Sequence, residues 1–157
     1  MDIPLVEQVK AQAKVLVPLV KTLEAELGEK QAHALVRKAL GGWAYKMGQQ
    51  ISAMGTGSPT EKMAAALPLF AAGDALDIEV LTQTPDAFEF NVTGCRYAQF
   101  YKELGVPELG FLLVCTPDFP LTEGVSPELE LARTQTIMQG ASYCDFRWRM
   151  KSKDKQS

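Results

Sequence analysis

Three cysteines are the residues of this sequence best suited to covalent chemistry, and all of them, Cys95, Cys115 and Cys144, fall in its second half. One interpretation is that each is an inert buried thiol, because free cysteine commonly packs as a small apolar residue. The other is that two or three of them converge on one pocket. There, a cation or the start of a helix would lower the pKa of a thiol and make it nucleophilic. Cys95 is best placed for this, since the sequence predicts a helix that starts directly after Gly94.

Charged residues in the same half of the chain provide the other parts of a candidate site. Asp118 and Asp145 are candidate general acids or bases, although Asp118 also suits a simple turn. Arg133 has the planar guanidinium that clamps a substrate carboxylate, whereas Arg147 alternates with apolar residues and also fits a solvated strand face. His33 is the only histidine, and its place within a helical pattern favours an ordinary helix position over a general base.

A metal site is the rival use of three thiols. Nineteen residues separate Cys95 from Cys115 and twenty-eight separate Cys115 from Cys144, so the sequence has no Cys-x-x-Cys pair. A fourth ligand would have to come from Asp118, Asp145 or solvent. We therefore expect no metal. The glycine-containing loop at residues 55–59 lacks the preceding strand and the lysine of a phosphate-binding loop, so we expect no nucleotide cofactor either.

The composition indicates one compact domain with a small-molecule partner. The 157 residues are 46% apolar and 22% charged, and we expect residues 1–150 to form a single domain followed by a disordered charged tail at 151–157. A formal net charge of -3 provides no basic field for nucleic acid or an anionic membrane. The odd number of cysteines, the absence of a signal-peptide pattern and the absence of a long apolar run favour a cytoplasmic protein.

The first third of the sequence has the period of helices. Apolar residues recur at three- and four-residue steps from Val6 to a stop at Gly28, and again from about residue 29 to 54. The second helix either continues through Gly41 and Gly42 or kinks there. A third helix is predicted from Pro59 to about residue 70, with Ser58 as its N-cap.

From residue 76 the pattern changes to alternation, which predicts strands. The expected elements are a hairpin of strands 76–83 and 88–92, a helix over 95–104, a short helix over 107–115 that ends at Pro117, and a closing hairpin with arms 131–137 and 143–150. Helices grouped together and strands joined by hairpins indicate an α+β fold. We expect N-terminal helices packed on one face of an antiparallel sheet of about four strands, built from two hairpins.

Five blocks of the second half resemble a known family. They are Cys95–Gly105, Pro107–Gly110, Cys115–Phe119, Arg133–Ala141 and Cys144–Arg147. Their order and spacing resemble the L-2-amino-thiazoline-4-carboxylic acid hydrolase family over roughly residues 91–150, with a looser likeness over 26–40. The resemblance implies a hydrolase that opens a small nitrogen- and sulfur-containing ring to give N-carbamoyl-cysteine without a cofactor. It also implies that one site contains Cys95, Cys115, Cys144, Asp118, Arg133 and Asp145.

A mechanism follows from this resemblance as a hypothesis. The thiolate of Cys115 or Cys144 attacks the amidine-like carbon, and water activated by an aspartate resolves the adduct. Arg133 holds the substrate carboxylate, and backbone amides near Gly94 or Gly140 stabilise developing charge. The alternative is direct attack by base-activated water, with the cysteines only shaping the pocket. The remaining residues expected to bind substrate are Arg147, Gly140 and Tyr143, the last at a position where the family pattern often has histidine or cysteine.

A weaker resemblance points to a different class of function. The order of helices, strand pair, helix and closing hairpin is also similar to 4-vinyl reductase-type ligand-binding domains, which are related to TRAPP-type trafficking folds. That resemblance implies a domain that binds or senses a small molecule without turning it over. A small cytoplasmic enzyme, expected to be a homo-oligomer, is the simpler interpretation.

Overall fold

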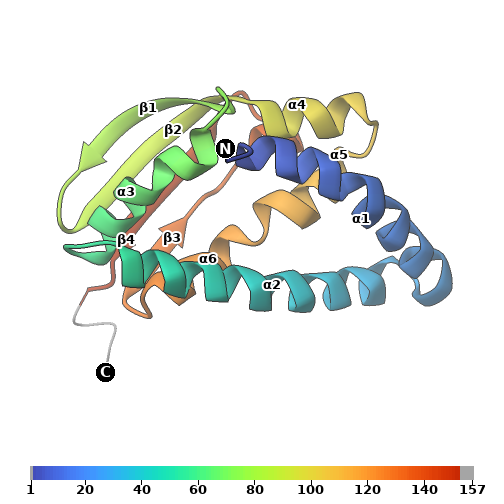
Figure 1. The fold of residues 1–157 in the computed structure, drawn as a ribbon, viewed down its shortest axis with the longest axis horizontal. Helices are drawn as coiled ribbons and strands as arrows, with labels where there is room; N and C mark the ends of the chain where they lie inside the picture. Colours follow the sequence, from blue (N-terminus) through green and yellow to red (C-terminus); the bar gives the residue numbers. More distant parts are fainter. Residues whose placement is uncertain (1, 153–157) are drawn as a thin grey trace.

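The structure, a computed structural model, describes residues 2–152 and has the expected three N-terminal helices and two strand pairs, with one more helix between the strand pairs than the sequence predicts (Figure 1). Its elements are α1 (Leu5–Leu27), α2 (Glu29–Met54), α3 (Pro59–Ala71), β1 (Leu76–Gln83), β2 (Ala87–Cys95), α4 (Arg96–Glu103), α5 (Pro107–Gly110), the π-helical turn η1 (Phe111–Cys115), α6 (Asp118–Val125), β3 (Leu129–Ala132), the 3-10 turn η2 (Ile137–Gln139) and β4 (Cys144–Met150). Of the tail expected at 151–157, residues 153–157 lie outside the described part of the chain. No helix within residues 2–152 is both long and apolar enough to cross a membrane.

The three N-terminal helices begin and end where the sequence predicts. Gly28 separates α1 from α2 with a φ of +84°, a conformation that glycine adopts without steric cost. Ser58 caps α3 as half of a capping box, in which Glu61 donates its backbone N–H to the serine hydroxyl and accepts the serine backbone N–H. Helix α2 continues without interruption through its two adjacent glycines.

The α+β prediction is confirmed by a four-stranded antiparallel sheet in the order β1-β2-β4-β3. In β2 and β4, Phe88 pairs with Trp148 and Val92 pairs with Cys144. These four side chains are buried on one face of the sheet, which the helices cover (Figure 1). The two strands that pair at the centre of the sheet are thus 56 residues apart at the Phe90–Phe146 pair, with α4, α5 and α6 between them.

In the second half one predicted strand boundary is wrong and one helix was missed. The first arm of the closing hairpin was expected at 131–137, but β3 ends at Ala132. The carboxylate of Asp145 accepts the backbone N–H groups of Thr134 and Gln135, so these groups are not available to extend the strand ladder. The chain also turns helical again directly after Pro117, since proline tolerates the position before a first helical turn, and the resulting helix α6 was not predicted.

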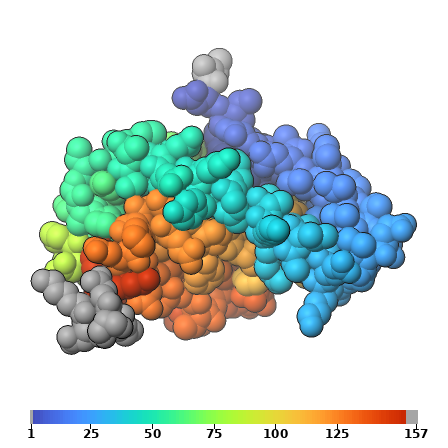
Figure 2. All heavy atoms as spheres, turned by 90° about the horizontal axis from the view of Figure 1, so that it is seen from below, coloured from blue at the N-terminus to red at the C-terminus, as the bar shows by residue number. Residues whose placement is uncertain are grey.

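Helices α2 and α6 cross so closely that their backbones are in contact. This contact fixes the position of α6 relative to α2. A Cβ atom on Gly48 of α2 would collide with the carbonyl oxygen of Leu121, and one on Gly124 of α6 would collide with that of Tyr45. Figure 2 shows α2 crossing one face of the molecule beside the orange segment that includes α6. This close crossing positions Asp118, the first residue of α6.

The buried side chains form two clusters. The first is made mainly by α1, α4, α5 and η1, and the second by α2, α3, α6 and the inner face of the sheet. Leu76 and Cys95 contact both clusters. The candidate site lies where the two clusters meet.

Candidate functional site

A cavity of about 530 Å³ lies between the N-terminal helices, η1, α6 and the sheet, within the size range of small-molecule sites. Most of its wall is aliphatic or aromatic. Five of the residues selected from the sequence line it: Cys95, Cys115, Cys144, Asp118 and Arg133. They come from β2, η1, β4, the first turn of α6 and the loop after β3, so the topology of the sheet brings together residues far apart in sequence.

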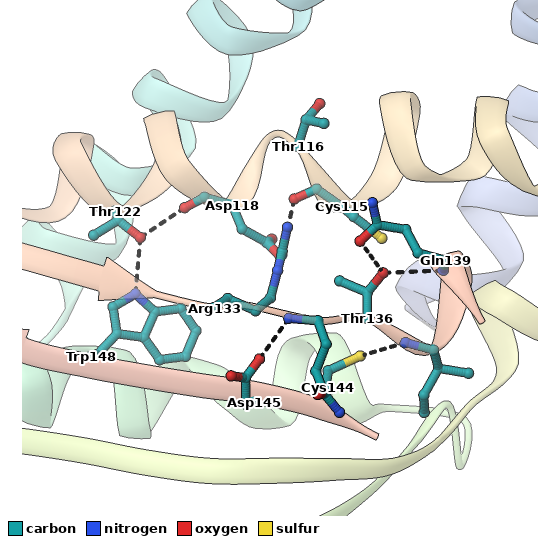
Figure 3. A network of polar contacts seen from close by, with 12 residues as sticks. Cys115, Thr116, Asp118, Thr122, Arg133, Thr136, Gln139, Cys144, Asp145 and Trp148 are labelled. Carbon is teal, nitrogen blue, oxygen red and sulfur yellow. Dashed lines mark hydrogen bonds and ion pairs between the residues drawn. The ribbon is translucent and has the colours of Figure 1, made fainter. Parts of the chain in front are cut away.

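Arg133 and Asp118 form the charged end of this cavity. Arg133 Nη1 donates to Asp118 Oδ2 at 2.6 Å and to the carbonyl oxygen of Cys115 at 3.1 Å. Figure 3 shows the Arg133 side chain reaching toward the turn that carries both acceptors. Its guanidinium also lies 5.1 Å from the ring centroid of Phe119 and 5.5 Å from that of Phe146. The cation is therefore held in place by an ion pair and two aromatic rings.

The pKa of Asp118 is suited to proton transfer near neutral pH. Burial raises it from 3.8 to about 6, although the Arg133 guanidinium and its hydrogen bond favour the charged carboxylate and limit the rise. The carboxyl side chain keeps 26% of its surface exposed, while that of Arg133 keeps only 3%. Asp118 can thus accept a proton from a bound water or thiol and return it to a leaving group.

Burial keeps the three thiols of the cavity in their protonated form at neutral pH. Burial is the largest influence on each and raises the pKa of Cys95, Cys115 and Cys144 above the ordinary thiol value. Two of them also have structural contacts: Cys95 Sγ accepts the N–H of Ala98 at 3.4 Å and caps α4, and Cys144 Sγ accepts the N–H of Ile137 at 3.2 Å. A thiol in this cavity would need a base such as Asp118 to become nucleophilic.

The other four residues selected from the sequence do not line the cavity. The Asp145 carboxylate accepts hydrogen bonds from the Thr134 hydroxyl and from the backbone N–H groups of Thr134 and Gln135. Burial by itself raises the pKa of Asp145, but these hydrogen bonds outweigh that effect and hold the pKa below its usual value. Arg147 donates to the carbonyl oxygen of Phe90 and to Asn91.

Tyr143 and Gly140 lie in the loop that precedes β4. The Tyr143 side chain is 37% exposed, and Gly140 ends η2 with a φ of +106°. A role for either in substrate binding stays a prediction. Both belong to the segment that holds Thr136 and Cys144 at the cavity, so their place is beside the site and not inside it.

Sequence reasoning did not identify three residues of the charged end. Phe119 and Phe146 flank the guanidinium, and Thr136 is buried in the cavity wall, where its hydroxyl caps η2 by accepting the N–H of Gln139. Phe119 and Phe146 stand in the sequence blocks Cys115–Phe119 and Cys144–Arg147, next to the two aspartates. The position of each phenylalanine beside an aspartate was the one sequence feature that could have pointed to it. The contact of both rings with Arg133 depends on the fold.

No group of three or more histidine, cysteine, aspartate or glutamate side chains within residues 2–152 is arranged to hold a metal ion. His33 lies away from the cavity and pairs with Glu24 across α1 and α2, with 2.9 Å between Nε2 and the carboxylate oxygen. The polar side chains that line the cavity are one carboxyl, one guanidinium, three thiols, two indoles, the amide of Gln12 and the hydroxyls of Tyr97, Tyr101 and Thr136.

Comparison with known proteins gives one family and one related fold. The family profile described as L-2-amino-thiazoline-4-carboxylic acid hydrolase matches residues 8–148. No curated protein matches the sequence. Among solved structures, the fold is similar to the phenol-responsive sensory domain of the transcription activator PoxR, solved with phenol, at a TM-score of 0.57 and 13% identity. The similarity covers 90% of this chain and 76% of that one.

Proposed function

Since this chain belongs to the L-2-amino-thiazoline-4-carboxylic acid hydrolase family, we propose that it hydrolyses a small ring containing nitrogen and sulfur in the cavity that holds Cys95, Cys115, Cys144, Asp118 and Arg133. The reference substrate is L-2-amino-thiazoline-4-carboxylate. Water adds to the carbon between the ring nitrogen and sulfur, the carbon–sulfur bond breaks, and the sulfur leaves as a thiol. The product is N-carbamoyl-cysteine, one water heavier than the substrate.

Arg133 binds the carboxylate of the ring in this proposal. Its hydrogen bonds to Asp118 and to the Cys115 carbonyl both use Nη1. Within residues 2–152 no protein acceptor binds Nη2 or Nε, so these donors are available to a ligand in the cavity that Arg133 lines. A guanidinium that is almost fully buried binds a carboxylate far more strongly than an exposed one, because little water competes.

Asp118 acts as the base that activates the attacking water. The observation that carries the proposal is this carboxyl at the charged end of an otherwise apolar cavity, with a pKa of about 6. The same group, once protonated, returns the proton to the leaving sulfur. The raised pKa values of the thiols favour attack by water over attack by a thiolate, and the thiols then shape the cavity around the ring.

The test is mass spectrometry of L-2-amino-thiazoline-4-carboxylate incubated with the purified protein. We expect a product one water heavier from the unmodified protein and an initial rate at least about a hundredfold lower from Asp118→Asn, because general-base catalysis contributes about that much. Asp86→Asn is the matched control, since Asp86 is exposed in the turn between β1 and β2. No product from a folded protein, or equal rates in the two variants, would contradict the proposal.

A second candidate function is binding of a small molecule without turnover. The apolar wall of the cavity and the related fold of a phenol-responsive sensory domain favour it. In that case a ligand would raise the melting temperature by mass action and be recovered unchanged. Recovery of intact thiazoline after prolonged incubation, together with a ligand-dependent rise in melting temperature, would replace the hydrolase proposal with this one.

A further inference from the structure

The cavity is too large for the reference ring alone. L-2-amino-thiazoline-4-carboxylate has nine non-hydrogen atoms. If each atom is given the volume of one water molecule in the liquid, roughly 30 Å³, the substrate fills about 270 Å³. The cavity is about 530 Å³. About half of the space would therefore hold no part of that substrate.

Apart from the charged pair and the thiols, most of the cavity lining is apolar. The charged pair and the three thiols lie toward η1, the start of α6 and the ends of β2 and β4. Helices α1, α2 and α3 contribute Val9, Leu16, Met47, Met63, Leu67 and Phe70 to the lining, together with the amide side chain of Gln12. A charged ring cannot gain from contact with these apolar side chains, whereas an aryl or branched alkyl group would gain by leaving water.

Two large apolar side chains of the cavity lining also reach solvent. Val15 of α1 and Trp43 of α2 line the cavity and are still 68% and 54% exposed, so the cavity reaches solvent between these two helices. Large exposed apolar side chains at the entrance of an apolar cavity suit a ligand that is itself partly apolar.

We infer that the ligand of this site carries an aryl or branched alkyl group on its polar ring, with the carboxylate at Arg133 and the apolar group against α1, α2 and α3. The reaction in this inference rests on the proposed function. The class of ligand rests on the size and the lining of the cavity. For a cyclic amidine, the apolar group is a substituent on the nitrogen outside the ring. Hydrolysis of such a compound follows the same course, with the substituent retained on the urea product.

Binding is tested first with compounds that contain no ring to open. Propanoate and 3-phenylpropanoate share a carboxylate and differ in the phenyl group. Both tryptophans of the chain, Trp43 and Trp148, line the cavity, so intrinsic fluorescence follows occupancy directly. We expect 3-phenylpropanoate to bind at least about tenfold more tightly, because the phenyl group buries apolar surface. Equal affinities would overturn the inference.

Turnover is tested with the thiazoline carboxylate and its N-phenyl derivative. We expect kcat/KM at least about tenfold higher for the N-phenyl compound, since the added binding energy is available in the transition state. Tighter binding of 3-phenylpropanoate with neither ring opened would overturn the hydrolase proposal and leave the ligand class standing. Opening of both rings at equal kcat/KM, without preference for 3-phenylpropanoate, would overturn the ligand class and leave the hydrolase.

Cavity-filling variants then locate the apolar group. Val9→Phe adds volume on the wall formed by α1, and Leu19→Phe places the same phenyl ring at an exposed position of the same helix that does not line the cavity. We expect the affinity ratio of 3-phenylpropanoate to propanoate to fall toward one in Val9→Phe and to stay at the wild-type value in Leu19→Phe. An unchanged ratio in a folded Val9→Phe protein would contradict the assigned position. If that variant does not fold, the wild-type comparison still decides the ligand class.

Discussion

Asp118 accepts a hydrogen bond of 2.6 Å from Arg133, and this pair joins the first turn of α6 to the loop that follows β3. The pair is asymmetric: the guanidinium is almost completely buried between two aromatic rings, whereas the carboxyl keeps part of its surface accessible. The arginine is therefore fixed, and the aspartate is the member that can exchange a proton with a bound molecule.

The first prediction concerns the pH dependence of hydrolysis. If Asp118 is the base, kcat/KM for the thiazoline rises with pH through about pH 6 and is level above it, because the carboxyl must be ionised. In Arg133→Gln the rise moves to higher pH, since the cation that lowers the pKa of Asp118 is lost. Arg149→Gln is the control, because Arg149 is exposed and pairs with Glu89 instead. A rise at the same pH in all three proteins would count against Asp118.

The second prediction concerns stability. The folded-state pKa of Asp118, about 6, lies above its unfolded value of 3.8, so the folded state binds this proton more tightly. The protonated carboxyl therefore stabilises the fold below pH 4, and this contribution is lost as the pH rises through 6. The free energy of unfolding falls by at most about 3 kcal/mol over that range. Urea unfolding should show the free energy of the wild type falling relative to Asp118→Asn between pH 4 and 7. Parallel curves for the two proteins would show that the carboxyl does not titrate in this range.

The third prediction concerns the thiols. With water as the nucleophile, the single replacements Cys95→Ala, Cys115→Ala and Cys144→Ala each keep kcat within about tenfold of the wild type, because no covalent bond to sulfur is formed. Stopped-flow assays of the three variants measure this, with melting temperatures to correct for loss of folded protein. A drop of several orders of magnitude in one folded variant would identify a nucleophile and restore the covalent route expected from the sequence.

The fourth prediction concerns the crossing of α2 and α6. Gly48→Ala places a methyl group against the Leu121 carbonyl and lowers stability by about 1–3 kcal/mol. Gly42→Ala is the matched control on the same helix: nothing lies within 4 Å of its Cβ position, so stability rises by about 0.5–1 kcal/mol. Thermal unfolding of both variants checks the opposite signs. A neutral Gly48→Ala would mean that the two helices separate easily.

Much of the fold follows from local signals in the sequence. Ser58 and Gly28 mark helix boundaries by capping and backbone conformation, and the alternation at Phe88, Phe90 and Val92 marks a half-buried strand. These features depend on neighbouring residues, so sequence reasoning finds them. The end of β3 depends on Asp145, which lies beyond it in the chain and captures the backbone that would have continued the strand. No pattern within residues 131–137 contains that information.

The sequence predicted five of the residues that line the cavity, but it did not predict how they are arranged. Two thiols come close through sheet pairing, because Val92 faces Cys144 across β2 and β4 and Cys95 follows three residues later. Which aspartate faces the cavity could not be read from the sequence, since Asp118 and Asp145 each follow a cysteine closely. Their separation depends on the alternation of β4, which turns Cys144 inward and Asp145 outward.

The position of β4 in the middle of the sheet sets the order in which the protein can assemble during synthesis. The ribosome delivers β4 after all the other described elements, yet β4 pairs with both β2 and β3 and carries Cys144, Phe146 and Trp148. Until it emerges, β2 has one open edge and the inner wall of the cavity is missing. The nascent chain can form its helices and the first hairpin early, but the site closes only in the last step of folding, when the final strand enters between its two neighbours.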